Sequence, residues 1–139
     1  MAPARSTVRA FTMSEHNVSL GRCSEDAAKA YLAKQGYRII EANYRTKLGE
    51  IDIIAKEKDT LCFIEVKARS SYAYGFPEEA VGRRKQQKIS RAALMYLQQH
   101  QLLHHACRFD VLSVLDDGQS APVFALIKNA FNVEGKYRY

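Results

Sequence analysis

The sequence predicts one α/β (α+β) domain, in which two helices flank a central mixed sheet in the order α-β-β-β-α-β-β. Its 139 residues suit a single domain, and the hydrophobic fraction of 47% is sufficient for a core. Two stretches have the periodicity of amphipathic helices, and shorter runs rich in Ile, Val and Phe are typical of strands. We expect residues 1–18, which lack periodicity, to be a flexible tail and residues 19–139 to form the domain.

The two helices are predicted from apolar side chains that recur every three or four residues. The first is expected over residues 22–35 and would end at Gly36. The second is expected over residues 77–100, because Pro77 and the acidic residues after it suit a helix start. The stripes comprise Ala28, Tyr31 and Leu32 in the first helix and Ile89, Ala92, Ala93, Tyr96 and Leu97 in the second.

Five strands are predicted from β-branched and aromatic runs bounded by turn residues. The second and third are separated only by the charged turn at residues 56–59, so they are expected to pair as an antiparallel hairpin. The predicted strands cover residues 37–42, 50–55, 61–68, 108–115 and 123–127.

Charge and hydropathy limit the classes of function. No apolar run approaches the roughly 20 residues that cross a bilayer. The first residues also lack the apolar stretch of a secretory signal. We therefore expect a soluble cytoplasmic protein with no membrane partner. The net charge of +6 favours a polyanionic partner, nucleic acid above all, but this is weak evidence unless the charge surrounds a site.

Three polar residues in the predicted hairpin have the character of a metal-dependent site. Asp52 interrupts one apolar strand, and Glu65 and Lys67 share a face of the next, since side chains alternate along a strand. Buried carboxylates are costly unless they are paired or bind a metal, and carboxylate oxygens suit Mg²⁺ or Mn²⁺. Lys67 would hold a scissile phosphate or orient the attacking water. Together these groups suit hydrolysis of a phosphodiester bond.

The same residues are also compatible with an ion-pair cluster that binds no metal. A single Glu-x-Lys triplet favours that interpretation, because the pattern is common by chance. An aspartate in one hydrophobic strand, a short hairpin and a Glu-x-Lys triplet in a second hydrophobic strand favour the metal site.

The arrangement of Asp52, Glu65 and Lys67 resembles the PD-(D/E)xK motif of the restriction-endonuclease-like nuclease superfamily, and the predicted element order resembles its core. A narrower set of motifs resembles the YraN-like family of uncharacterised bacterial proteins, over nearly all the chain after the tail. These motifs are Gly21-x-x-x-Glu25, Gly49-Glu50-Ile51-Asp52, Phe63-Ile64-Glu65-Val66-Lys67-Ala68-Arg69, Tyr74-Gly75, Arg108-Phe109-Asp110-Val111 and Asn129-Ala130-Phe131.

The resemblance implies a role for each matching residue. Asp52 and Glu65 would bind a catalytic Mg²⁺ or Mn²⁺, with a contribution from the Val66 carbonyl, and Lys67 would be the motif lysine. Glu25, on the first helix, matches an additional acid of archaeal Holliday-junction resolvases, and it would complete the metal site or hold a second ion. Resolvases also suggest a homodimer, although no heptad or interface stripe in this sequence establishes one.

Candidate contacts to nucleic acid follow the Glu-x-Lys strand. A basic helix face beside a metal site would grip phosphates without reading sequence. For each basic residue, a solvated helix face is an equally good interpretation, and the tyrosine would either stack on bases or pack over the sheet edge. The candidates are Arg69, Arg84, Lys85, Lys88 and Tyr74.

The function that the sequence favours is a Mg²⁺- or Mn²⁺-dependent endonuclease that hydrolyses DNA, branched or single-stranded. The first alternative is a non-catalytic nucleic-acid-binding module on the same fold. The second is a structural protein whose acids form only an ion-pair network. A nuclease-like fold would leave these alternatives open, because fold does not determine function.

Overall fold

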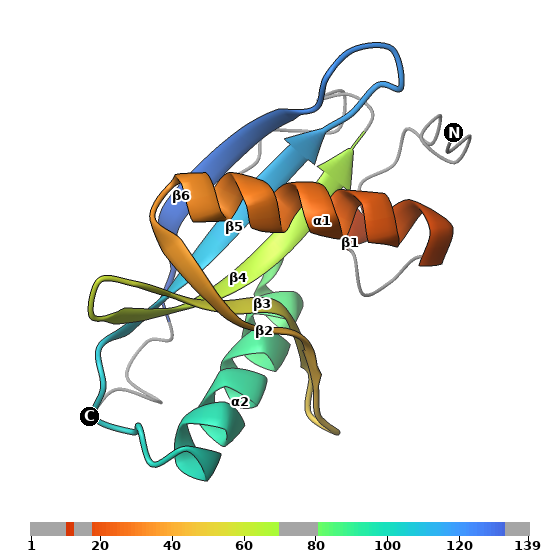
Figure 1. Cartoon of the computed structure of the whole chain (residues 1–139). Coiled ribbons are helices and arrows are strands. Elements are labelled where there is room, and N and C mark those ends of the chain that lie inside the picture. Colours follow the sequence, from red (N-terminus) through yellow and green to blue (C-terminus); the bar gives the residue numbers. More distant parts are fainter. Residues whose placement is uncertain (1–10, 13–17, 70–80, 133–139) are drawn as a thin grey trace.

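The structure is a computed structural model that describes residues 11–12, 18–69 and 81–132, with side chains from Glu25 onward (Figure 1). The described residues form two helices and six strands. In chain order these are β1 (Phe11–Thr12), α1 (Val18–Lys34), β2 (Tyr37–Arg45), β3 (Glu50–Glu57), β4 (Thr60–Arg69), α2 (Arg83–Gln99), β5 (Cys107–Leu115) and β6 (Val123–Phe131).

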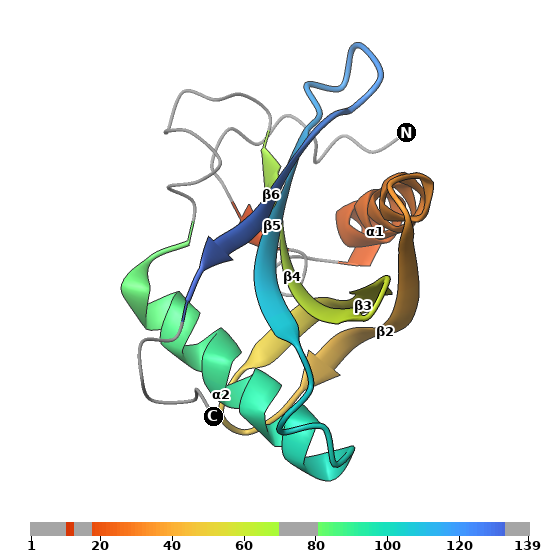
Figure 2. The ribbon, with the colours of Figure 1, turned by 90° about the vertical axis from the view of Figure 1, so that its left-hand side faces the viewer.

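The strands form one mixed sheet in the spatial order β2-β3-β4-β5-β6, and β1 pairs with β4. Strands β4 and β5 are parallel, and the other pairs are antiparallel. A parallel connection needs a crossover, which α2 supplies between β4 and β5. The two helices cover opposite faces of the sheet (Figure 2). The predicted fold class, the element order and the β3–β4 hairpin are therefore confirmed.

Two apolar cores, one on each face of the sheet, follow from the alternation of side chains along β4. Leu61 and Phe63 pack beneath α2, and Cys62, Ile64 and Val66 pack beneath α1. Helix α2 contributes the predicted buried face, which comprises Ile89, Ala92, Ala93, Tyr96 and Leu97. In α1, the predicted residues Ala28 and Leu32 are fully buried and Tyr31 packs against their cluster.

Several element boundaries differ from the predicted ones. Helix α2 begins at Arg83, because Gly82 before it is extended (φ −73°, ψ 167°) and caps the helix. The predicted start at Pro77 lies outside the described residues. Strand β2 continues to Arg45, since its ladder with β3 runs to the tight turn at residues 46–49. The polar residues at the end of β2 concealed this extension, and β1 was not predicted because it has only two residues.

A buried ionic network joins one end of the sheet. Asp110, which is fully buried, accepts hydrogen bonds from the Tyr37 hydroxyl (2.9 Å), Arg108 Nε (2.9 Å) and the Asn129 amide (2.8 Å). Arg108 also pairs with Glu57 at 2.6 Å. Burial and the nearby Asp110 carboxylate raise the pKa of Tyr37, so this hydroxyl stays protonated as a donor. The network connects β2, β3, β5 and β6, and it accounts for Asp110 as a structural residue.

We expect the Asp110→Ala substitution to lower the free energy of unfolding by about 3 kcal/mol, because it removes the fully buried acceptor of three hydrogen bonds and leaves the partly buried Arg108 guanidinium with only Glu57 as its acidic partner in this network. Chemical denaturation followed by circular dichroism measures this loss. The substitution of an exposed acid, Asp26→Ala, is the control and should change stability by less than about 0.5 kcal/mol. A loss below about 1 kcal/mol in the Asp110 variant would contradict the structural role.

Candidate active site

Strand β3 breaks its regular alternation at Asp52. Ile51 packs in the core beneath α2 and Ile53 in the core beneath α1, although residues two apart in a regular strand share a face. Asn43, which lies between the paired positions Ala42 and Tyr44 and therefore opposite Asp52, has a positive φ of 55°. Strand β3 is therefore irregular at Asp52, and strand β2 is irregular at the opposite residue, Asn43. The irregularity allows the Asp52 side chain, only 2% exposed, to reach toward β4.

The β3–β4 ladder stops one residue short of Asp52. Its last pair is Ile53 with Ile64, and the next pair on this edge of β4 among the described residues is Thr12 with Lys67. Between Ile64 and Lys67, the Val66 amide donates a hydrogen bond to Asp52 Oδ2 at 2.8 Å. A side-chain carboxylate therefore satisfies a backbone donor that a strand would otherwise pair. The bond fixes Asp52 beside Glu65, the residue before Val66.

Glu65 carries the unusual electrostatics of the site. Its side chain is 2% exposed and lies on the face of β4 toward α2. Burial raises the pKa of Glu65 well above its usual range, and the charge of Asp52 and a hydrogen bond between the two carboxyls raise it further. Lys85 and Lys67 act in the opposite direction. Two buried acids thus compete for negative charge, and either a proton or a cation would relieve their repulsion.

Two lysines supply positive charge near this acid pair. Lys67 is half-buried on β4, two residues after Glu65 and on the same face. Lys85 Nζ, from the first turn of α2, lies 3.7 Å from Glu65 Oε2. That distance exceeds a hydrogen bond, and Glu65 Oε2 accepts no hydrogen bond from the described residues. The structure therefore brings Asp52, Glu65 and Lys67 together, as predicted, and adds Lys85 directly to the site.

Glu25 reaches the site only through an intermediary. Its Oε2 atom pairs with Lys29 Nζ at 3.0 Å and accepts a hydrogen bond from Asn43 Nδ2 at 3.3 Å. Asn43 lies opposite Asp52 in the β2–β3 ladder, so the hydrogen bond ties Glu25 to the strand segment next to Asp52. No group of three or more His, Cys, Asp or Glu side chains within residues 25–69 and 81–132 is gathered closely enough to hold a metal. Asp52 and Glu65 alone form the acid pair.

The remaining predicted residues are in different environments. Arg84 and Lys88 are exposed on α2, where a partner can reach them. Arg69 is only 4% exposed, so its guanidinium does not lie on an open surface. Tyr74 lies outside the described residues. The sequence named Lys85 only as a phosphate contact, and its contact with Glu65 was missed. A signal existed, since Lys85 precedes the buried Ile89 by one helical turn and so shares its face.

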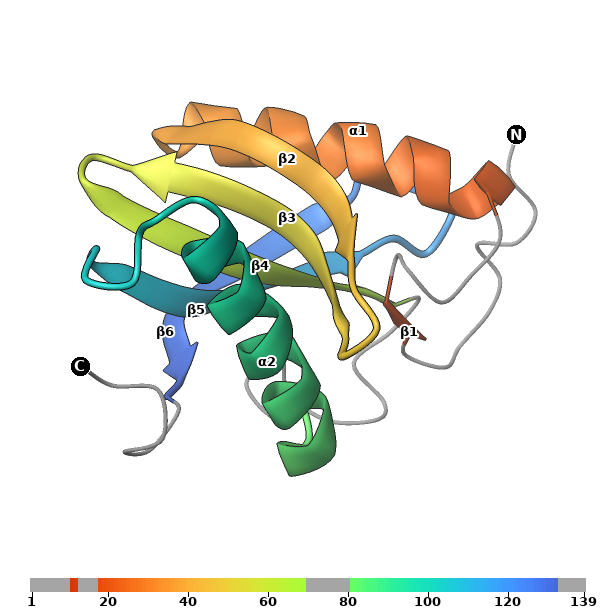
Figure 3. The ribbon, with the colours of Figure 1, turned by 90° about the horizontal axis from the view of Figure 1, so that it is seen from below.

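A polar hollow of about 340 Å³ opens beside the acid pair. Its lining residues come from the β2–β3 turn and from the first half of α2. Figure 3 shows these two segments of the ribbon next to each other. Hydrogen bonds from the Leu48 and Gly49 amides to Thr46 Oγ1, both 3.0 Å, stiffen the turn. A Cβ on Gly49 would lie 2.4 Å from the Lys88 carbonyl oxygen, so only glycine permits this approach. The hollow is lined by Thr46, Lys47, Leu48, Gly49, Glu50, Lys85 and Lys88.

Comparison with known proteins identifies the family. Residues 24–114, which include the acid pair, both lysines and α2, match the model of the "Uncharacterised protein family UPF0102". The chain belongs to the UPF0102 family. A UPF0102 protein of Desulforapulum autotrophicum is 46% identical over 88% of this chain and 100% of its own length. One of Desulfosudis oleivorans is 49% identical over 81% of this chain and 89% of its own. The predicted YraN-like family is confirmed.

One further property of this UPF0102 protein concerns membranes. Neither helix that the structure describes is both long enough and apolar enough to cross a bilayer.

The raised pKa of Glu65 predicts a pH-dependent cost to the UPF0102 fold. Below the unfolded pKa, about 4, the carboxyl is protonated in both states and costs nothing. Above it the unfolded carboxyl ionises first, so the cost grows with pH until the pH passes the folded pKa. In EDTA, Glu65→Gln should therefore raise the melting temperature near neutral pH by roughly 3–6 °C, and the gain should shrink toward about pH 4. Thermal unfolding across this range measures the difference. The exposed Glu41→Gln control should show no such gain, and a pH-independent gain in the Glu65 variant would contradict the prediction.

The close approach of Gly49 to α2 makes a second prediction for this UPF0102 protein. Gly49→Ala should lower the free energy of unfolding by about 1–3 kcal/mol, because the new methyl group meets the backbone of Lys88. The matched control is Gly82→Ala, where a Cβ would meet nothing within 4 Å, and where the weaker cap should cost about 0.5–1 kcal/mol. Urea denaturation measures both free energies of unfolding. Equal losses in the two variants would show that the Lys88 backbone does not restrict the side chain at position 49.

Proposed function

We propose that this UPF0102 protein is a Mg²⁺- or Mn²⁺-dependent endonuclease that hydrolyses phosphodiester bonds of DNA at Asp52, Glu65 and Lys67. The observation that carries the proposal is the acid pair. Two carboxyls, each 2% exposed, are held side by side, although such burial is costly without a compensating cation. Glu65 Oε2 accepts no hydrogen bond from the described residues, so it is suited to serve as a ligand.

The donor set fits a small divalent cation. Mg²⁺ usually binds to proteins through one or two carboxylates and completes its coordination with water and substrate phosphates. Asp52 and Glu65 would provide those carboxylates, with the Val66 carbonyl as the third candidate donor. When bound, the cation would polarise the phosphate and make water a stronger nucleophile at neutral pH. The Val66 amide holds Asp52 in place, so the carboxylate needs little rearrangement.

The basic side chains would bind and orient the substrate. Lys67 shares a face with Glu65, so its ammonium group is placed to neutralise a non-bridging oxygen of the scissile phosphate. Lys85 neutralises part of the Glu65 charge in this structure, and it also lines the polar hollow. Arg84 and Lys88 are exposed on the same helix and extend the positive surface. Glu25 would act through Asn43, by orienting the strand segment opposite Asp52.

The non-catalytic alternative is favoured by one specific contact. The Lys85 ammonium lies 3.7 Å from Glu65 and compensates part of its charge without a metal. In a pure binding module, this contact would be permanent, and the acid pair would be a buried ionic cluster. In the nuclease, a cation added to the protein would compete with Lys85 for Glu65. Metal-dependent turnover therefore separates the two functions.

The test is cleavage of a labelled panel of single-stranded, duplex, flap and four-way-junction DNA with Mg²⁺ or Mn²⁺. We expect cleavage of at least one substrate, no cleavage in EDTA, and a fall in rate of roughly 100-fold or more for Asp52→Asn and Glu65→Gln. These substitutions keep the size of each side chain while removing its charge. Lys67→Gln should reduce the rate without abolishing metal binding, because lysine is not a ligand.

A matched control excludes a contaminating nuclease and a general effect of charge. Asp59→Asn removes an acid from the exposed turn of the same β3–β4 hairpin, and this variant should cleave like the unaltered protein. Equal cleavage by the Asp52, Glu65 and Asp59 variants would contradict the proposed site. Salt-sensitive DNA binding with no turnover in either metal would favour the binding module.

A further inference from the structure

A second, apolar hollow of about 280 Å³ adjoins the polar hollow, since the two share a lining residue. Leu48, at the tip of the β2–β3 turn, lines both hollows. The other lining residues of the apolar hollow are Arg91, Leu94, Met95 and Gln98, all from α2. We infer that the two hollows form one subsite for an unpaired nucleotide of the DNA strand, with its phosphate in the polar hollow and its base in the apolar one.

Charge supports the assignment of the polar hollow to a phosphate. Its charged lining residues are Lys47, Lys85 and Lys88, against the single acid Glu50. Glu50 is itself near Arg45, at 3.8 Å, which compensates part of its charge. Lys85 also lies beside Glu65, so a phosphate in this hollow would be adjacent to the acid pair. Three ammonium groups around a small hollow repel one another, and a polyanion relieves that repulsion.

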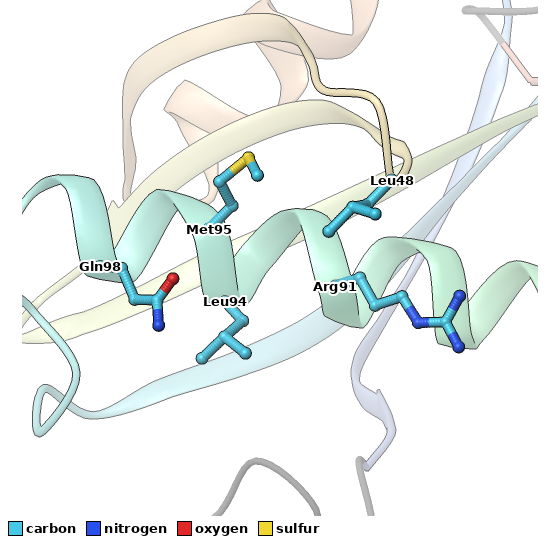
Figure 4. A pocket seen from close by; sticks show the side chains of 5 residues that line it. All are labelled: Leu48, Arg91, Leu94, Met95 and Gln98. Carbon is cyan, nitrogen blue, oxygen red and sulfur yellow. The ribbon is translucent and has the colours of Figure 1, made fainter.

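The shape and chemistry of the apolar hollow suit a nucleobase. Leu48 extends from the turn toward α2, with Met95 and Arg91 on either side of it (Figure 4). Leu48 is 45% exposed, which is costly for a large apolar side chain unless a partner covers it. Aliphatic side chains and a guanidinium plane both stack on bases, and the Gln98 amide at the rim is able to hydrogen-bond a base edge.

The residues that line the two hollows follow one another along α2. Lys88, Arg91, Met95 and Gln98 recur every three or four residues, so they form one stripe along α2. From Lys88 to Gln98 this stripe is roughly 15 Å long, at about 1.5 Å per residue. It begins at the polar hollow, which Lys88 lines, and continues along the apolar hollow, which Arg91, Met95 and Gln98 line. A DNA strand lying along the stripe would place a phosphate at the polar hollow and a base at the apolar hollow.

The same features determine the class of ligand. Arg91 at the rim and the adjacent lysines favour a polyanion over an apolar peptide or a second copy of this basic chain. A base enters a side pocket only when it is not stacked in a duplex. The ligand would therefore be single-stranded DNA or an unpaired nucleotide at a branch. This inference rests on the proposed nuclease function for the choice of DNA.

Binding in EDTA tests the inference independently of cleavage. The full chain would be titrated, by fluorescence anisotropy, into labelled oligothymidylate and into an abasic strand of the same length. The variant Leu48→Ala/Met95→Ala should bind oligothymidylate about tenfold more weakly and the abasic strand with nearly unchanged affinity. Lys88→Gln should weaken binding of both strands by similar factors and reduce the salt dependence. Thermal unfolding confirms that each variant is folded.

Matched controls are Ile40→Ala and Val123→Ala, which shorten exposed apolar side chains outside both hollows and should leave both affinities unchanged. The inference is overturned if the double variant weakens both strands equally or weakens neither. It is also overturned if the double variant converts a dimer to a monomer in sedimentation, since a second copy would then cover the hollow. Base-dependent binding without metal-dependent cleavage would leave this inference standing and remove the proposed activity.

Discussion

The hydrogen bond from the Val66 amide to Asp52 is the constraint on which the rest of the site depends. It exists because the β3–β4 ladder ends at Ile53 and Ile64, and among the described residues no strand pairs with Glu65 and Val66 on that edge of β4. A buried backbone donor must find a partner, and the Asp52 carboxylate provides it. Through this one bond, an interruption in the sheet fixes one acid beside another. The same interruption separates the regular hairpin from the pairing with β1.

Helix α2 places one lysine beside the acid pair and another on the surface near it. Its apolar face packs on the sheet through Ile89, Ala93 and Tyr96, which fixes the position of the helix. Lys85, one turn before Ile89, is thereby held near Glu65, and Lys88 is held against the Gly49 turn. The packing of the core thus determines where the positive charges lie. The glycine at position 49 is part of this arrangement, because any side chain there would displace the turn from the helix.

The sequence predicted the parts of the site that depend on local patterns. Asp52, Glu65 and Lys67 were identified because strand alternation and a short hairpin are readable within about twenty residues. The contact of Lys85 with Glu65 was not, since it depends on how α2 docks on the sheet. Burial of Arg69 was missed for a related reason, because it lies at the end of β4 where sequence does not show which neighbours cover it. The bridging role of Asn43 depends on an irregular backbone conformation that composition does not reveal.

Asp110 and Glu65 are buried acids in the same sheet, but their carboxyl groups have different hydrogen-bond partners. Asp110 is fully buried, but a tyrosine, an arginine and a backbone amide donate hydrogen bonds to it. Glu65 is almost as deeply buried, yet it faces another carboxyl, and among the described residues its Oε2 atom accepts no hydrogen bond and lies 3.7 Å from Lys85 Nζ. The fold is therefore able to satisfy a buried carboxylate fully where structure alone requires it. The unfavourable environment of Glu65, beside a lysine that lines the polar hollow, is therefore the observation on which the proposed metal site rests.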